Sequence, residues 1–478
     1  MSTNMSRFHR SFGWCLVALA ALVFGRPALA VSTCEDLQLP PLNPIRIPDS
    51  YRFELPNGMV VYLVEDHELP LISVSAIVRT GSLWEPVEKA GLAAITSAVM
   101  QTGGTPSVSS EQLSKELDRL GASFQTWVGD GWSGFGANML KADVDRVMLM
   151  LTDLLQHPAL PEAKIEQAKT AQRDKILRRY ESPTSAVSDE FYRILFGRDT
   201  AFGHMSELKT IEAIRREDVV AFNQQFYQTE NIILGVRGDF EAQEMRGRIE
   251  RSFGAWPRSG HSKPSMPTVD SAVRNRTGIY LIPKEDLNQS SVIIGQLGGR
   301  MDDPDYSALA VMNKILDARL FARVRAEQGL SFHTESAWDA GWDWPGAFTV
   351  SASTKAGTTV KLLNVLKLEV KKLTEDQASE EELRQARDNI LHGLPFEFDG
   401  VGKILWRLMT YEYYGYPQDH LQRYQENVAK VTPAEVLQVA RQHLRPDHFV
   451  ILVVGNEKEF EQPLSTLGPV TRIDLTKP

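Results

Sequence analysis

The stretch GLAAITSAVMQTGGT, residues 91–105, decides the fold of the chain. An alternating apolar run at residues 72–78 precedes it and is separated from it by the turn at Gly81-Ser82. This order predicts a strand, a loop and a buried helix that ends at the paired glycines Gly103 and Gly104. Because the helix consists of small side chains, we expect its backbone to pack close to neighbouring elements.

Local signals extend the pattern on both sides of this helix. Asn57-Gly58 between two apolar runs predicts a β-hairpin, and Ser109 with Gln112 predicts a capping box at the start of a helix that Gly121 ends. A long helix from about residue 162 to 180 is broken at Ser182-Pro183. Strands are predicted at 51–55, 59–64, 72–78, 124–128, 134–138 and 231–237, and further helices at 109–120 and 143–156.

The same order of patterns restarts after a Pro-rich linker at residues 257–271. Residues 291–295 parallel 74–78, residues 308–317 parallel the central helix, residues 360–373 repeat the amphipathic stripe at 144–155, and 448–456 match 231–239. We therefore predict an α+β fold of two homologous halves, each with a mainly antiparallel sheet covered by helices, facing each other around a cleft. The predicted organisation is a signal peptide at 1–30, an extended arm at 31–49, domains at 50–256 and 272–460, and a tail at 461–478.

The N-terminus has the features of a secretory signal peptide. Arg7 and Arg10 precede an apolar run at residues 14–24, and an Ala-x-Ala site ends at Ala30. A membrane anchor is the alternative, but the run is too short to span a bilayer comfortably. We expect cleavage near Ala30, a periplasmic or secreted protein, and no stable membrane insertion.

The net charge and the cysteine content limit the kinds of molecule that the chain is expected to bind and the bonds that it is expected to form. Loss of three arginines with the signal peptide changes the formal net charge from −9 to −12, which argues against nucleic acid or anionic lipid as the main partner. Cys15 lies in the signal peptide, so Cys34 remains alone and forms no internal disulfide. A lipid anchor at Cys34 is the alternative, but Thr33 fits that signal poorly, and a free thiol is favoured.

From about residue 51 to 455 the chain resembles the two-half members of the pitrilysin and mitochondrial processing peptidase family, the inverzincins. The resemblance rests on short matches that occur in the same order and on the same elements. These are Asn57-Gly58-Met59-Val60-Val61, Gly81-Ser82 before Gly91-Leu92-Ala93, Leu120-Gly121-Ala122, His157-Pro158, Tyr227 with Asn231, Gly238-Asp239, and Leu320-Phe321 with Arg325 and Gly329-Leu330.

This resemblance implies a zinc site that the sequence lacks. In the family, two histidines at i and i+4 of the central helix and a distal glutamate bind zinc, and a glutamate between the histidines acts as general base. The histidine positions read Ala94 and Ala98 here, the base position reads Ser97, and the distal position reads Lys175, beside Asp174. The histidines outside the signal peptide include no i, i+4 pair, and no Gly-x-Ser-x-Gly motif occurs. We predict no catalytic residue, no metal and no cofactor in this chain.

The resemblance also implies a substrate-binding role for the second half. Zinc-free subunits of family heterodimers contribute an arginine and a tyrosine that hold the substrate backbone. Arg325 fits the arginine, whereas Phe332 takes the tyrosine position and lacks its hydroxyl. A surface arginine near Glu327 is the alternative for Arg325. Trp338, Trp342 and Trp344, in a predicted loop, are candidates to line the cleft, cap a core or meet a partner.

Three functional hypotheses follow. The leading one is a zinc-free, non-catalytic subunit of a periplasmic heterodimeric metallopeptidase, which helps a zinc-bearing His-x-x-Glu-His homologue to bind peptide. The second is a structural subunit that binds a peptide or protein without any peptidase role. The third is an enzyme that uses residues outside these motifs.

Overall fold

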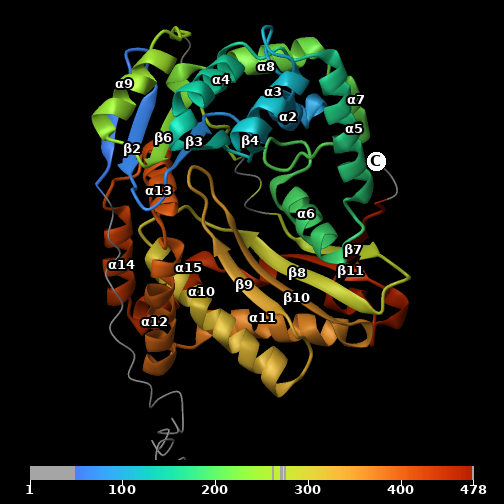
Figure 1. Ribbon diagram of the computed structural model, residues 1–478. Helices are drawn as coiled ribbons and strands as arrows, with labels where there is room; N and C mark the ends of the chain where they lie inside the picture. Colours follow the sequence, from blue (N-terminus) through green and yellow to red (C-terminus); the bar gives the residue numbers. More distant parts are fainter. Residues whose placement is uncertain (1–48, 261–262, 270–272, 274–275, 476–478) are drawn as a thin grey trace, which may run out of the picture. The chain divides into compact units, whose positions relative to one another are not determined.

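The computed structural model describes residues 49–260, 263–269, 273 and 276–475, so the predicted signal peptide and nearly all of the arm lie outside the described residues. Two six-stranded sheets, each with its own helices, form the two halves of the described chain (Figure 1). Both sheets are mainly antiparallel, which confirms the predicted α+β fold of two homologous halves. No helix in the described ranges is long and apolar enough to cross a membrane.

The first half contains residues up to about 256. Its sheet has the order β1-β2-β6-β3-β5-β4. The strands are β1 (Tyr51–Glu54), β2 (Val60–Glu65), β3 (Leu71–Val78), β4 (Ser123–Val128), β5 (Ser133–Leu140) and β6 (Ile232–Gly238). The helices are α2 (Leu92–Thr102), α3 (Ser110–Leu120), α4 (Val144–Gln156), α5 (Glu162–Arg178), α6 (Pro183–Phe196), α7 (Leu208–Ala213), α8 (Arg216–Phe226) and α9 (Ala242–Phe253).

The second half repeats this arrangement. Its sheet has the order β12-β7-β11-β8-β10-β9, so five strands of each sheet follow one topology, with a parallel pair at β2-β6 and at β7-β11. The strands are β7 (Gly278–Pro283), β8 (Gln289–Leu297), β9 (Thr334–Asp339), β10 (Ala347–Lys355), β11 (Val450–Gly455) and β12 (Val470–Arg472). The helices are α10 (Tyr306–Leu320), the π-helical segment η7 (Phe321–Glu327), α11 (Thr359–Glu375), α12 (Glu380–Glu397), α13 (Val401–Tyr414), α14 (His420–Lys430) and α15 (Pro433–His443).

The local signals act as predicted. Gly58 turns the β1-β2 hairpin with φ 89°, a left-handed conformation that glycine adopts without strain. The side chain of Ser109 accepts a hydrogen bond from the backbone N–H of Gln112, and Oε1 of Gln112 accepts one from the backbone N–H of Ser109, which closes the capping box of α3. Gly121 ends that helix with φ 60°. These devices set the boundaries of the elements that surround α2.

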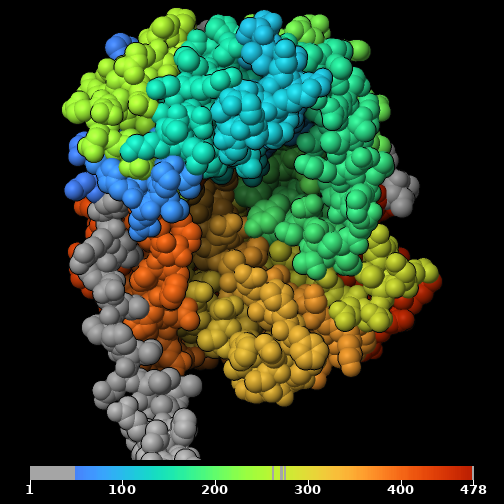
Figure 2. Space-filling view, viewed as in Figure 1, coloured from blue at the N-terminus to red at the C-terminus, as the bar shows by residue number. Residues whose placement is uncertain are grey.

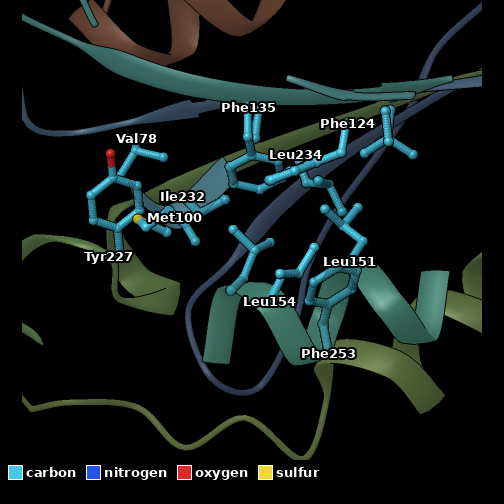
Figure 3. Packing of buried hydrophobic residues seen from close by; sticks show 14 of the residues in the cluster. Val78, Met100, Phe124, Phe135, Leu151, Leu154, Tyr227, Ile232, Leu234 and Phe253 are labelled. Atoms are coloured by element: carbon cyan, nitrogen blue, oxygen red, sulfur yellow. The ribbon is translucent and has the colours of Figure 1, made fainter. Parts of the chain in front are cut away.

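One face of the first sheet packs against the helices of its own half. Figure 3 shows part of this core, in which Phe124 and Phe135 of the sheet meet Leu151 and Leu154 of α4. Tyr227, which follows α8, lies in the same cluster beside Val78 and Met100. Burial of so much apolar surface, at roughly 25 cal/mol per Å², supplies most of the stability of the half.

The opposite faces of the two sheets are covered by exchanged helices. Helix α6 belongs to the first half but packs on β8 and β11 of the second, and its green surface meets the yellow and orange surface of that half (Figure 2). Its apolar side chains form one buried cluster with strands of the second half. The members are Val187, Phe191, Ile194, Leu195 and Phe196 of α6, and Val273, Ile282, Ile293, Ala347, Val450, Leu452 and Val454.

Helix α13 makes the reciprocal contact. It belongs to the second half and lies across β6, β2 and β3 of the first (Figure 1). Glu412 of α13 accepts hydrogen bonds from Arg52, at 2.7 and 3.0 Å, and from the Tyr62 hydroxyl at 2.8 Å. The sequence analysis assigned no helix at 401–414 and did not indicate that a helix of either half covers the sheet of the other.

The close packing of α13 on β6 at Gly235 allows the exchange of helices between the halves to be tested by mutation. A Cβ atom on Gly235 of β6 would lie 2.4 Å from the sulfur of Met409 on α13. Because overpacking a filled core costs about 1–3 kcal/mol, we expect Gly235→Val to lower the free energy of unfolding by that amount in denaturant titrations.

The matching control is the double variant with Met409→Ala, which removes the clashing atoms. We expect its loss of stability to be smaller than the sum of the two single losses. Additive effects would show that α13 does not press on β6.

Candidate functional site

Helix α2 is held at its N-terminus by a buried carboxylate. Gly91 precedes the helix with φ 105°, and a Cβ atom there would lie 2.4 Å from the Ile211 side chain, so only glycine fits. The two carboxylate oxygens of Glu85 accept hydrogen bonds from the amides of Gly91 at 3.0 Å and Ala93 at 2.8 Å. Glu85 thus satisfies amides that the first turn of a helix leaves unpaired, and its negative charge favours the N-terminal end of the helix dipole.

His204 lies next to this carboxylate. Its Nε2 is 3.4 Å from Oε1 of Glu85, and both side chains are only 4% exposed. Burial lowers the pKa of His204, but the hydrogen bond and the charge of Glu85 outweigh that effect and raise the pKa above its usual value. Sequence reasoning missed both residues, because Glu85 lies six positions before Gly91, too far for a capping box.

The positions that would hold zinc form one stripe on α2. Ala94 and Ala98 are half-buried, one turn apart, while Ser97 between them is buried. The backbone carbonyl of Ser97 accepts a hydrogen bond from the Thr126 hydroxyl of β4 at 2.9 Å. Two methyl groups and one hydroxyl do not provide the imidazole and carboxylate ligands that zinc needs, so these residues do not fit the metal.

The distal position gives no ligand either. Lys175 and its neighbour Asp174 are exposed near the end of α5. Within the ranges that the structure describes, no three His, Cys, Asp or Glu side chains converge as a metal site requires. No metal-dependent step can therefore be assigned to residues of this helix.

Tyr227 lies on the buried side of helix α2. Its hydroxyl is fully buried and makes no hydrogen bond of good geometry in the described part of the chain. Burial raises its pKa to about 12, against a smaller opposing effect of the nearby hydroxyls of Ser133 and Ser97. A neutral phenol with so high a pKa is a poor proton carrier at neutral pH, so it does not replace the lost general base.

The residues predicted to bind substrate lie on the surface of the second half. Arg325 is exposed on η7, which packs against α10, α11 and β9, and its guanidinium lies 5.1 Å from the centre of the Phe321 ring. It is Arg323 that pairs with Glu327. Phe332 is 90% exposed, so its apolar ring is fully available to a partner or substrate.

The tryptophan prediction needs one correction. Trp338 lies in strand β9 and not in a loop, because it continues the alternation that buries one face of that strand. Trp342 and Trp344 do lie in the β9-β10 loop. Trp342 stacks on Tyr414 of α13 at 5.3 Å within the second half. Trp344 packs against Phe202 of the first half at 5.8 Å and so contributes to the contact between the halves.

Fold and site together define a two-half, peptidase-like α+β protein in which Ala94, Ser97 and Ala98 occupy the positions expected for zinc ligands and the general base. A family model described as insulinase (peptidase family M16) matches residues 60–205, and one described as peptidase M16 inactive domain matches residues 213–390. The chain belongs to peptidase family M16, the pitrilysin and mitochondrial processing peptidase family.

Relatives in sequence are named as proteases. An uncharacterized zinc protease of Rickettsia bellii is 24% identical over 349 residues, which are 71% of this chain and 82% of that protein. The mitochondrial-processing peptidase subunit beta of Saccharomyces cerevisiae is 22% identical over 440 residues, covering 86% of this chain and 92% of the yeast protein.

Solved structures share the fold. A peptidase M16 inactive domain from Pseudomonas fluorescens superposes with a TM-score of 0.77 at 21% identity, covering 87% of this chain and 100% of that one. The periplasmic protease PqqL from Escherichia coli superposes with a TM-score of 0.72 at 14% identity, covering 92% of this chain and 50% of PqqL.

The Glu85–His204 pair predicts a pH-dependent stability. Because the pKa of His204 is raised in the folded state, the stabilisation is fully present below the unfolded pKa of about 6.5 and is lost as pH rises through the folded pKa. We expect the difference in unfolding free energy between the wild type and His204→Gln to shrink from pH 5.5 to pH 8.5. His392→Gln, an exposed position on α12, controls for loss of a histidine as such. A constant difference across this range would contradict the pairing.

Because Ala94 and Ala98 lie on one face of α2, we predict that histidines at these two positions create a zinc site. Histidines at i and i+4 of one helix face can ligate one metal, and the half-buried positions of Ala94 and Ala98 leave room for imidazoles. We expect Ala94→His/Ala98→His to bind zinc about tenfold more tightly than either single variant, measured by competition with a chromophoric chelator. Equal affinities of the single and double variants would show that the two positions do not share a face.

Proposed function

We propose that this chain is the zinc-free, non-catalytic subunit of a heterodimeric M16 metallopeptidase, and that a partner with the His-x-x-Glu-His helix carries the zinc and cleaves the peptide. One observation carries the proposal. The complete two-half scaffold is kept, with α2 capped by Glu85 and packed in place, while Ala94, Ser97 and Ala98 supply no ligand. With this scaffold and no metal ligand on α2, the chain would contribute to the paired enzyme by binding peptide.

The exposed surface around η7 is the proposed contact with peptide. Arg325 can donate hydrogen bonds to backbone carbonyls, while Phe332 offers an apolar ring that packs on a side chain. The net negative charge of the chain favours basic peptides through long-range attraction. The name of the yeast relative, a subunit of a processing peptidase, is in keeping with a paired assembly.

A periplasmic location accompanies this proposal. It rests on the features of residues 1–30, which predict export, and is supported by the likeness in fold to a protease described as periplasmic. Zinc would then be supplied only by the partner chain.

The alternative is a structural subunit that binds a peptide or protein without a peptidase role. The missing hydroxyl at Phe332 favours it, because phenylalanine cannot hydrogen-bond a substrate backbone. Recovery of this chain from periplasm in a defined assembly that contains no peptidase would favour this alternative.

Mixing experiments test the leading proposal. We expect the mature chain alone to hold far less than one zinc per molecule and to cleave no peptide, and we expect cleavage by a His-x-x-Glu-His homologue from the same organism to rise when the chain is added. Size-exclusion chromatography should show one complex of both chains. No association and no change in cleavage would refute the proposal.

The variant Arg325→Ala tests whether Arg325 helps to bind the peptide substrate in the mixture of the two chains. Loss of a charge-assisted hydrogen bond costs about 1.5–3 kcal/mol, so we expect kcat/KM of the complex to fall at least about tenfold. Arg384→Ala removes another exposed helical arginine, on α12, and should leave the rate unchanged. Equal effects of the two variants would remove Arg325 from the proposed contact.

A further inference from the structure

The second half contains a cavity of about 280 Å³ between α10, α12, α13 and α14. The most informative residues of its wall are Tyr306, Asn313, Trp338, Tyr411, His420 and Tyr424. Its size is close to the lower end of the roughly 300–1,000 Å³ typical of small-molecule sites, which suits one amino-acid residue, either free or at the end of a peptide.

This cavity lies over the counterpart of the degenerate zinc site. Ala310, Asn313 and Lys314 line it from α10 with the i, i+3, i+4 spacing that Ala94, Ser97 and Ala98 have on α2. The hydroxyl of Ser336 on β9 donates to the backbone carbonyl of Asn313 at 3.3 Å, just as the Thr126 hydroxyl on β4 donates to that of Ser97.

The two helix faces therefore occupy equivalent places in the two halves. On α2 the face presents methyl groups and a buried hydroxyl, whereas on α10 it presents an amide and a lysine to a cavity. The second half thus has the polar side chains of Asn313 and Lys314 at the positions that correspond to Ser97 and Ala98, which supply no metal ligand in the first half.

Three residues that line the cavity each have a buried polar atom with no hydrogen-bond partner in the described ranges. The atoms are Oδ1 of Asn313, Nε1 of Trp338 and Nε2 of His420. Asn313 and Trp338 are 8% and 9% exposed, and the Asn313 amide nitrogen donates to Ser336 O at 3.1 Å, which leaves its oxygen free to accept. Buried polar atoms without partners are costly, so an acceptor, a donor and a histidine nitrogen in one cavity indicate a polar ligand.

Aromatic rings form the rest of the wall. Tyr306 and Tyr424 stack at 5.3 Å with an interplanar angle of 27°, and Tyr411 meets His420 edge-on at 5.4 Å. Such walls favour a planar ring, which packs by stacking or by edge-to-face contact.

Charges of both signs lie around these rings. Lys314 and Glu397 are exposed, and Arg407 lies 3.6 Å from Glu397. The wall thus offers two cations and one anion, which match the carboxylate and ammonium of a zwitterion better than they match a ligand of a single charge.

We propose that this cavity binds an aromatic amino acid with a polar ring group, tyrosine or tryptophan, either free or as the terminal residue of a peptide. The ring lies among the tyrosines, and its charged end meets Lys314, Arg407 and Glu397. A tyrosine hydroxyl accepts from the indole N–H of Trp338 and donates to Oδ1 of Asn313. An indole N–H of the ligand donates to Oδ1 of Asn313 or to Nε2 of a neutral His420. The site is independent of any partner subunit.

Titration calorimetry on the full mature chain tests this proposal. We expect L-tyrosine or L-tryptophan, or a dipeptide that begins or ends with one of them, to bind with a Kd below about 1 mM. L-Alanine, which has the same charges without a ring, should bind far more weakly. Failure of all the aromatic ligands to bind would overturn the proposal and indicate a cavity filled by water.

Blocked derivatives distinguish the two sources of the ligand. Tyrosine amide lacks the carboxylate and N-acetyltyrosine lacks the ammonium group. If both bind more weakly than tyrosine, the ligand is the free amino acid. If one of them, and the dipeptide of the same polarity, bind as well as tyrosine, the ligand is a peptide terminus.

Gly393→Phe places a ring in the cavity. Gly393 lines the cavity from α12, and a Cβ atom there meets nothing within 4 Å, so the helix can accept the side chain. We expect this variant to abolish binding at an unchanged melting temperature. Gly247→Phe, on the exposed helix α9, is the matched control and should bind as the wild type does.

Trp338→Phe provides a second, finer variant. It keeps an aromatic ring but removes the indole N–H, and we expect affinity to fall about fivefold or more. Binding that survives both Gly393→Phe and Trp338→Phe would lie elsewhere and would overturn the proposal. Because every readout is binding to the chain alone, its failure is distinct from failure of the proposed peptidase pairing.

Discussion

The exchange of α6 and α13 between the two halves is the contact on which the structure depends. Each sheet buries one face under its own helices and the other under a helix from the opposite half. Separating the halves would expose the second apolar face of both sheets at once, together with the Glu412 contacts to Arg52 and Tyr62. Each half therefore depends on the other for the burial of its sheet, whatever residues α2 carries.

This constraint explains how the zinc positions could change without loss of the fold. Helix α2 is held by Glu85 at its N-terminus, by Thr126 through a backbone carbonyl, and by packing of residues on its buried side. Ala94 and Ala98 lie on its half-buried stripe, where a smaller side chain leaves no enclosed cavity. Metal ligands at positions 94 and 98 would contribute chemistry, whereas the Glu85 cap and the packing of the buried side contribute stability. The ligand positions can therefore carry alanine while the helix stays in place.

Much of the fold was predictable because its signals are local. The glycine turn at Gly58, the capping box at Ser109 and the repeated strand–helix order each follow from a few neighbouring residues. The exchange was not predictable, since hydrophobic periodicity shows which face of α6 or α13 is buried but not what covers it. The same limit explains Glu85 and His204, which are 119 positions apart and meet only in the folded chain. At the candidate site, the sequence indicated the missing ligands, while the environments of Arg325 and Phe332 required coordinates.

The pseudo-symmetry of the halves shows where binding chemistry remains. Helices α2 and α10 occupy equivalent places in the two halves. In each, a hydroxyl from a neighbouring strand, Thr126 or Ser336, donates a hydrogen bond to a backbone carbonyl of the helix. On α2 the half-buried stripe consists of two methyl groups and the buried hydroxyl of Ser97, whereas on α10 the corresponding positions Asn313 and Lys314 line a cavity. Polar atoms left unpaired in an apolar wall are disfavoured unless something uses them. The stripe on α2 thus offers methyl groups and one hydroxyl, whereas the corresponding positions of the second half carry polar side chains beside a cavity.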